Sequence, residues 1–267
     1  MTENQSAQPP SGPAAIAGQT VFITGASAGI GAACAHAFAR AGARLLLAAR
    51  RQDKLRDLAA ALQKEGSPAV HTITLDVRDA AQVSATLGAL PEAWRAIDVL
   101  INNAGLSRGL DKLQEGKPED WDEMIDTNVK GLLYVTRAVV PGMIERGRGH
   151  IVNLGSTAGH MTYPKGAVYC ATKAAEKSIS EGLRQDVLGT PVRVTSIDPG
   201  MVQTDFSKVR FRGDEERAAK VYQGVTPLQP EDIADAILWA VTRPAHVNIS
   251  EMLITSIDQA NSLLFNR

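Results

Sequence analysis

Tyr169 and Lys173 stand four residues apart in the segment YCATK. On a helix this spacing places both side chains on one face, one turn apart. When a hydride reduces a carbonyl, the oxygen becomes negative and must be protonated. A tyrosine, whose ordinary pKa is near 10, transfers protons poorly unless a nearby cation stabilises its phenolate. Lys173 would supply that cation, so the pair predicts proton chemistry at an alcohol or carbonyl, although the same spacing also occurs between ordinary surface neighbours.

Ser156 follows an apolar run, HIVNLG, that has the character of a buried strand. A hydroxyl at the end of such a strand can hydrogen-bond the substrate oxygen and hold it against Tyr169, which stabilises the developing oxyanion. The alternative is that Ser156 only caps the next turn. Ser156 and Tyr169 are therefore the predicted substrate contacts of the catalytic centre.

A glycine-rich turn lies near the start of the chain, where Val21–Gly31 reads VFITGASAGIG. An apolar strand runs into the turn and a helix leaves it, so free backbone N–H groups and the helix dipole favour a pyrophosphate. Glycine permits the tight turn and the close approach of the backbone. Glycines in an ordinary loop are the weaker interpretation. The predicted pyrophosphate contacts are Gly25, Ser27, Gly29, Ile30 and Gly31.

Arg50 and Arg51 follow the second apolar run, and no acidic residue occurs between Gly42 and Asp53. An NAD site offers a carboxylate here to the ribose hydroxyl, whereas an NADP site needs cations for the 2′-phosphate. Guanidinium groups bind such a phosphate through charge-assisted hydrogen bonds. The cofactor is therefore expected to be NADP(H), unless the two arginines merely solvate the start of a helix.

Short β-rich apolar runs alternate with longer helical patterns along the chain. The runs lack in/out alternation, as expected for strands covered by helices on both faces. We expect a single-domain α/β fold of Rossmann type, a doubly wound parallel sheet of about seven strands. The expected strands are 21–24, 44–49, 70–75, 99–102, 150–154, 192–197 and 252–255, and the main helices are 29–41, 53–64, 119–146 and 167–188.

The 267 residues carry 28 basic and 29 acidic side chains and are 44% hydrophobic. This balance gives no reason to expect nucleic acid or a membrane as partner and favours a small-molecule substrate. The two cysteines show no metal-ligand or disulfide spacing, so no metal site is expected. We expect a cytoplasmic protein with a flexible tail over residues 1–17, one domain over 18–267 and a substrate lid around 203–224.

The segments TGASAGIG, NNAG (102–105), NLGS and YCATK occur together and in order, and the chain thereby resembles the short-chain dehydrogenase/reductase family. The resemblance implies an NADP-dependent oxidoreductase, with a homotetramer as the expected assembly. It gives Asn128 the role of holding a water in a proton relay to Lys173. It also implies cofactor contacts from Asp76, Val77, Asn103, Ala104, Gly105, Tyr169, Lys173, Pro199, Gly200, Val202 and Thr204.

Within that family the sequence is most similar to bacterial NADP-dependent 3-hydroxy acid (serine) dehydrogenases, notably in GHIVNLGSTAG, FSKVRFRGD and PAHVNI. This resemblance implies that Arg210 or Arg212 pairs with a substrate carboxylate, and Arg210 is the preferred candidate. A solvated cation on a mobile loop is the alternative. Two other functions stay open: broad ketone or aldehyde reduction, and NADP-dependent regulation without catalysis. A structural interaction protein would leave Arg50 and the glycine turn without a role.

Overall fold

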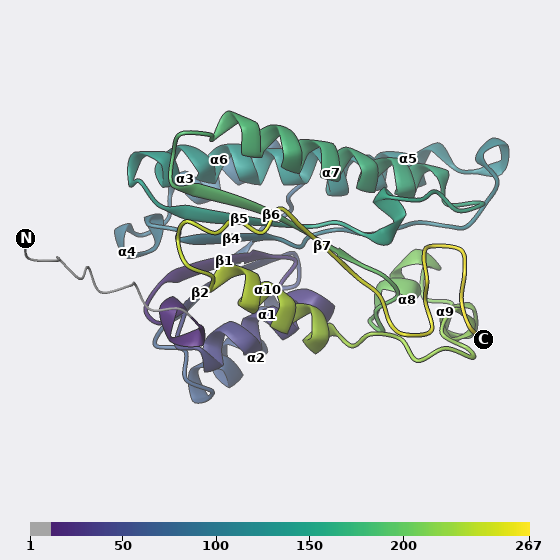
Figure 1. Ribbon diagram of the computed structural model, residues 1–267, viewed down its shortest axis with the longest axis horizontal. Coiled ribbons are helices and arrows are strands. Elements are labelled where there is room, and N and C mark those ends of the chain that lie inside the picture. The colour runs from purple at the N-terminus through teal and green to yellow at the C-terminus, as the bar shows by residue number, and fades with distance from the viewer. Residues whose placement is uncertain (1–11) are drawn as a thin grey trace, which may run out of the picture.

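The computed structural model describes residues 12–267, and its centre is a seven-stranded sheet (Figure 1). All neighbouring strands run parallel, in the order β3-β2-β1-β4-β5-β6-β7. The chain winds outward from β1 in one direction and then from β4 in the other, which confirms the predicted doubly wound Rossmann sheet. The strands are β1 (Thr20–Thr24), β2 (Arg44–Ala49), β3 (Val70–Thr74), β4 (Val99–Asn102), β5 (Gly149–Leu154), β6 (Val192–Pro199) and β7 (Glu251–Ile254).

Helices cover both faces of the sheet. In Figure 1, α1, α2 and α10 lie below it and α3, α5, α6 and α7 lie above it. The helices are α1 (Gly29–Arg40), α2 (Gln52–Lys64), α3 (Ala80–Gly88), α4 (Glu92–Arg95), α5 (Pro118–Ile125), α6 (Leu132–Glu145), α7 (Ala167–Asp186), α8 (Phe206–Arg210), α9 (Glu215–Val221) and α10 (Pro230–Val241), with short 3-10 turns η1 (Pro13–Ile16), η2 (Leu113–Glu115) and η4 (Thr157–Gly159). Within residues 12–267, no helix is both long and apolar enough to cross a membrane.

Each face of the sheet has its own apolar core, because successive strand residues point to opposite faces. Ile23 and Leu47 join the core under α1 and α10, whereas their neighbours Phe22 and Leu46 join the core under α6. All four side chains are fully buried. Burial on both faces explains why the strand sequences are continuous apolar runs rather than alternating ones.

The predicted single helix over 119–146 is wrong in one respect: a π-helical segment, η3 (Asp126–Gly131), interrupts it. The segment begins directly after α5 and ends where α6 begins. Gly131 packs against Val77, whose Cγ2 would lie 2.7 Å from any Cβ at this position. Glycine at this position therefore allows the helix to approach the segment after β3 closely. Hydrophobic periodicity alone does not reveal a π-helical turn of this kind.

The expected tail over 1–17 lies mainly outside the described residues, but its last part belongs to the fold. Pro13–Ile16 forms η1, and Ile16 is only 2% exposed because it packs into the core beside α1. The tail therefore ends earlier than expected. At the other end, the expected lid around 203–224 contains α8 and α9, which lie beyond the ends of the strands (Figure 1).

Candidate active site

A cavity of about 400 Å³ opens at the carboxyl ends of the central strands. In doubly wound sheets this is the edge where ligands bind, because the loops diverge where the strand order reverses. With the exception of Gly31, every residue predicted to contact the cofactor lines this cavity. They are Gly25, Ser27, Gly29, Ile30, Arg50, Arg51, Asp76, Val77, Asn103, Ala104, Gly105, Tyr169, Lys173, Pro199, Gly200, Val202 and Thr204.

The glycine turn forms one wall, and its glycines meet steric and conformational demands. Gly25 and Gly29 have φ of +64° and +55°, which favours glycine. A Cβ on Gly31 would lie 2.5 Å from the Gly25 oxygen and from Asn103 Nδ2. Asn103 Nδ2 donates to the carbonyl oxygens of Thr24 (2.9 Å) and Gly25 (3.2 Å). Gly31 is therefore placed behind the turn, where it lets the helix pack closely, rather than in the cavity.

Two exposed arginines stand at the end of β2, at the mouth of the same cavity. Arg51 Nη2 donates to Ser27 Oγ at 3.0 Å, which ties its guanidinium to the glycine turn. Arg50 also lines the cavity, and its charge lowers the pKa of Asp76. The end of β2 therefore presents cations to the cavity, as a 2′-phosphate requires.

Asp76 is held by a cation that sequence reasoning did not single out. Arg78 donates to both Asp76 oxygens, at 2.9 and 3.0 Å from Nε and at 2.6 Å from Nη2, and this pairing lowers the pKa of the carboxyl. The backbone after β3 is thereby fixed where Val77, which is 7% exposed, lines the cavity. This geometry suits a flat ring lying against the backbone and Val77.

Three independent features of the cavity fit an NADP molecule: the glycine turn, the two arginines after β2, and the pair Tyr169 and Lys173. The glycine turn leaves room and free N–H groups for a pyrophosphate. Arg50 and Arg51 offer positive charge at one end, and Tyr169 and Lys173 stand toward the other. When bound, the cofactor would supply the hydride acceptor or donor, and the protein's own side chains would handle the proton.

Tyr169 is 8% exposed and lies beside Ser156 in the cavity lining. Burial raises the pKa of the phenol, whereas the positive charge of Arg210 and a hydrogen bond with Ser156 lower it. Ser156 Oγ also accepts a hydrogen bond from Ala158 N at 3.1 Å, so it caps η4 as well. The two interpretations of Ser156, cap and substrate contact, are therefore compatible.

Lys173 is 8% exposed, and its ammonium donates to the Leu154 carbonyl oxygen. Burial lowers its pKa, and the carboxyls of Glu176 and Asp198 oppose that effect. The cation with the largest effect on the Tyr169 pKa is thus Arg210 and not, as expected, Lys173. The physical reason is that the Lys173 ammonium faces a backbone carbonyl and two acids, whereas the Arg210 guanidinium lies 5.4 Å from the centre of the Tyr169 ring.

Asn128 lies in the π-helical segment and is 3% exposed. Its Oδ1 accepts from Leu106 N at 2.9 Å, and its Nδ2 donates to Leu106 O at 2.8 Å and to Thr172 Oγ1 at 3.0 Å. The side chain thus joins the loop after β4 to α7, one residue before Lys173. It does not line the cavity itself, so its expected part in a water relay remains a prediction.

Arg210 and Arg212 have different surroundings on the lid. Arg210 Nη2 donates to the Tyr163 hydroxyl at 3.0 Å, and the guanidinium also lies 5.1 Å from the Phe206 ring. Its Nε is buried and has no hydrogen-bond partner among residues 12–267. Arg212 instead forms an ion pair with Asp120 of α5. Of the two lid arginines, Arg210 therefore has no acidic partner among the described residues, and its side chain is not part of the lining of the cofactor cavity.

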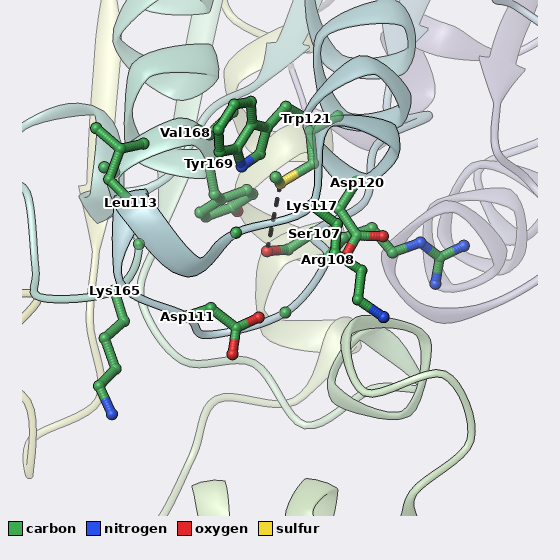
Figure 2. Close-up of a pocket in the computed structure, with 15 residues that line it drawn as sticks. Ser107, Arg108, Asp111, Leu113, Lys117, Asp120, Trp121, Lys165, Val168 and Tyr169 are labelled. Carbon is green, nitrogen blue, oxygen red and sulfur yellow. Dashed lines mark hydrogen bonds between the residues drawn. The ribbon is translucent and has the colours of Figure 1, made fainter.

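A second hollow opens on the other side of Tyr169 (Figure 2). Trp121 and Val168 stand beside the Tyr169 ring, and Asp111, Lys117 and Lys165 surround the opening (Figure 2). Sequence reasoning did not find this hollow, because its residues come from two separate stretches of the chain, 107–124 and 165–169. The hollow has an apolar inner wall and a charged rim, but its volume of about 30 Å³ is enough for no more than a few water molecules.

The lid is attached to the loop after β4 by several contacts. Arg108 donates to the Val209 carbonyl oxygen and forms an ion pair with Glu123 at 2.6 Å, and Gly109 N donates to the Arg210 oxygen at 3.1 Å. Phe206 and Val209 line the cofactor cavity. These contacts hold the segment that was expected to form a lid beside the cavity, and none of them was predicted from the sequence.

Comparison with sequence families gives a match over residues 19–215 to the family described as short chain dehydrogenase. The NADP-dependent 3-hydroxy acid dehydrogenase of Salmonella typhi is 49% identical over 241 residues, which is 90% of this chain and 96% of that protein. Sulfoacetaldehyde reductase 2 of Chromohalobacter salexigens is 46% identical, over 90% of this chain and 95% of that protein.

Comparison with solved structures gives a consistent result. The closed form of a serine dehydrogenase complexed with NADP+ superimposes with a TM-score of 0.88 at 45% identity, covering 92% of this chain and 98% of that one. Serine dehydrogenase from Escherichia coli gives a TM-score of 0.79 at 41% identity, covering 91% of this chain and 100% of that one.

Proposed function

Because the chain belongs to the short-chain dehydrogenase family, we propose that it interconverts a 3-hydroxy acid such as serine and the corresponding 3-oxo acid with NADP(H). One observation supports the substrate class: the Arg210 guanidinium, whose buried Nε has no hydrogen-bond partner among the described residues, lies over the ring of Tyr169, the proposed acid-base residue. A carboxylate on the substrate would satisfy that donor while its hydroxyl reaches Tyr169 and Ser156.

In the direction of oxidation, the ionised Tyr169 oxygen would accept the proton of the substrate hydroxyl, and the carbon that carries this hydroxyl would give up its hydride to bound NADP+. Ser156 donates a hydrogen bond that holds the substrate oxygen. Arg210 lowers the pKa of Tyr169 and thereby increases the ionised fraction. Lys173 and Asn128 hold the proton path behind the phenol, and the lid over 203–224 excludes water from it. Reduction runs the same steps in reverse.

We also propose a homotetramer in the cytoplasm with no nucleic-acid or membrane partner, and one domain over 18–267. The near-neutral balance of charges supports the choice of a small-molecule partner. The likeness to a sulfoacetaldehyde reductase adds a second anionic substrate class, because a guanidinium can also donate charge-assisted hydrogen bonds to the oxygens of a sulfonate. Sulfonates therefore belong in the substrate panel.

The test is a panel of serine, 3-hydroxypropanoate, 2-hydroxyethanesulfonate and 2-butanol, with NADP+ and NAD+ compared by cofactor absorbance. We expect the highest kcat/KM with a 3-hydroxy acid and NADP+, and a loss of about 100-fold or more in the Tyr169→Phe variant. Full activity in that variant would remove the acid-base assignment. A preference for 2-butanol would replace the acid substrate with broad alcohol oxidation, and a preference for NAD+ would overturn the cofactor assignment.

A further inference from the structure

Two buried carboxyls lie behind Lys173, on the side away from the cavity. Glu176 is fully buried on α7, three residues after Lys173, and Asp198 is 1% exposed on β6. Both pack against Gly155: a Cβ there would overlap Asp198 Oδ1 and would lie 2.6 Å from Glu176 Oε2. The two acids are therefore neighbours, and they flank the residue that precedes Ser156.

The hydrogen bonds of the two acids are unequal. Glu176 Oε1 accepts from Ser180 Oγ at 3.0 Å, whereas its Oε2 has no partner within residues 12–267. Asp198 is fully engaged, since Oδ1 accepts from Ser196 Oγ at 2.6 Å and Oδ2 lies 2.7 Å from His160 Nε2. A buried carboxylate oxygen without a donor is costly, and a proton on it removes that cost.

The charges around Glu176 favour such a proton. Burial raises the pKa of Glu176 to about 7, Lys173 opposes this rise and Asp198 adds to it. Asp198 in turn contacts His160, whose Nδ1 lies 3.0 Å from the Lys177 ammonium. Lys177 pairs with Glu251 of β7 at 3.2 Å, so the cluster reaches the surface.

We propose that Glu176 is a positioning residue for the reaction: beside Asp198 it takes up and releases a proton and so sets the charge that Lys173 and Tyr169 experience. This inference rests on the proposed function, because it assigns the proton step to Tyr169. The titratable groups that act on Glu176 are Lys173 and Asp198, and His160 contacts Asp198. Arg210 and Cys170 act on Tyr169.

The sign of the effect follows from the charges. Ionised Glu176 raises the pKa of both Lys173 and Tyr169. In the neutral Glu176→Gln variant the pKa of Tyr169 falls, so the phenolate needed for oxidation forms at lower pH. We expect the pH profile of kcat for alcohol oxidation to move toward acid by roughly 0.5 to 1 pH unit.

A second measurement, the pH dependence of Tm, detects the ionisation of Glu176 independently of catalysis. Because its folded-state pKa is raised, wild-type stability falls as pH rises from the ordinary value of 4.5 to about 7 and then stays lower. The neutral variant lacks this loss. The difference in Tm, Glu176→Gln minus wild type, should be larger at about pH 8 than at about pH 4.5 by roughly 3 °C or more.

The experiment measures both quantities for wild type, Glu176→Gln, Ser180→Ala and the control Glu181→Gln. Glu181 is exposed on the same helix, so its variant should match wild type. Ser180→Ala keeps the carboxyl but removes a hydrogen bond that lowers its pKa. If Glu176→Gln fails to fold, Ser180→Ala should still move the pH profile toward acid by a smaller amount. Its Tm relative to wild type should be lower at about pH 8 than at about pH 4.5, because a further raised pKa increases the loss of stability.

Superimposable pH profiles of wild type and the tested variants would overturn the inference, as would a Tm difference independent of pH. Full activity in Tyr169→Phe would instead overturn the proposed function. An acid-shifted profile together with a pH-dependent Tm difference supports the proposal.

Discussion

Replacing Arg210 by Gln tests how the lid recognises an acidic substrate. The variant keeps a hydrogen-bonding side chain but removes the charge that lies 5.4 Å from the Tyr169 ring. A hydrogen bond to a charged group contributes about 1.5 to 3 kcal/mol. At about 1.4 kcal/mol per factor of ten, KM for a 3-hydroxy acid should rise between about tenfold and 100-fold. A neutral secondary alcohol has no carboxylate to lose, so its KM should change by less than about threefold.

The same substitution also acts on the proton step. Arg210 is the leading influence that lowers the pKa of Tyr169 against the effect of burial. Without it that pKa rises, so the pH profile of kcat for oxidation should move toward alkali for acidic and neutral substrates alike. The variant thus separates binding, which depends on the substrate, from proton transfer, which does not.

Initial rates over a range of pH and substrate concentration give both quantities, with Arg212→Gln as the matched control. Arg212 belongs to the same lid but pairs with Asp120, so its loss reports only on loosening of the lid. If the acid and the neutral alcohol lost the same KM factor in Arg210→Gln, the proposed carboxylate contact would be refuted. An unmoved pH profile would refute the electrostatic argument.

Three further perturbations test the cofactor site and the lid. Arg50→Ala should raise KM for NADPH about tenfold and leave KM for NADH unchanged, whereas Arg56→Ala, on the exposed surface of α2, should change neither in the same rate assay. Gly31→Ala should lower Tm by several degrees and weaken NADPH binding, as measured by calorimetry, because its Cβ would lie 2.5 Å from the Gly25 oxygen. The control Gly88→Ala has open space around its Cβ and should leave Tm the same or higher. Arg108→Met should accelerate proteolysis within 203–224 by at least about threefold, because it loses the contact with Val209 and the ion pair with Glu123; equal cleavage rates would show that these contacts do not hold the lid.

The sheet could be predicted because its strands are buried on both faces, and such strands leave continuous apolar runs in the sequence. β2 and β4 have the predicted bounds, and the other strands differ by one or two residues at their ends. The residues that line the cavity could be predicted because they occupy short segments that directly follow strands. Gly31 is the instructive exception: its spacing belongs to the turn, but its contacts are with Asn103 and the Gly25 backbone.

The surroundings of the catalytic lysine could not be predicted, because they depend on contacts between distant segments. Glu176 resembles any acidic residue on an amphipathic helix until β6 places Asp198 beside it. The dominance of Arg210 over Lys173 at Tyr169 likewise requires the lid to fold back over the site. Local spacing identifies which residues take part, whereas the balance of charges among them is a tertiary property.

The π-helical turn at Asp126–Gly131 makes the registration of the site sensitive to chain length. A π turn holds one more residue than an α turn, so Asn128 can contact Leu106 and Thr172 while α5 and α6 keep their own faces on the protein. Deleting one residue there would restore α-helical geometry and remove the turn that presents the Asn128 amide. A shortened chain would keep the sheet and the flanking helices but lose the link between the loop after β4 and α7.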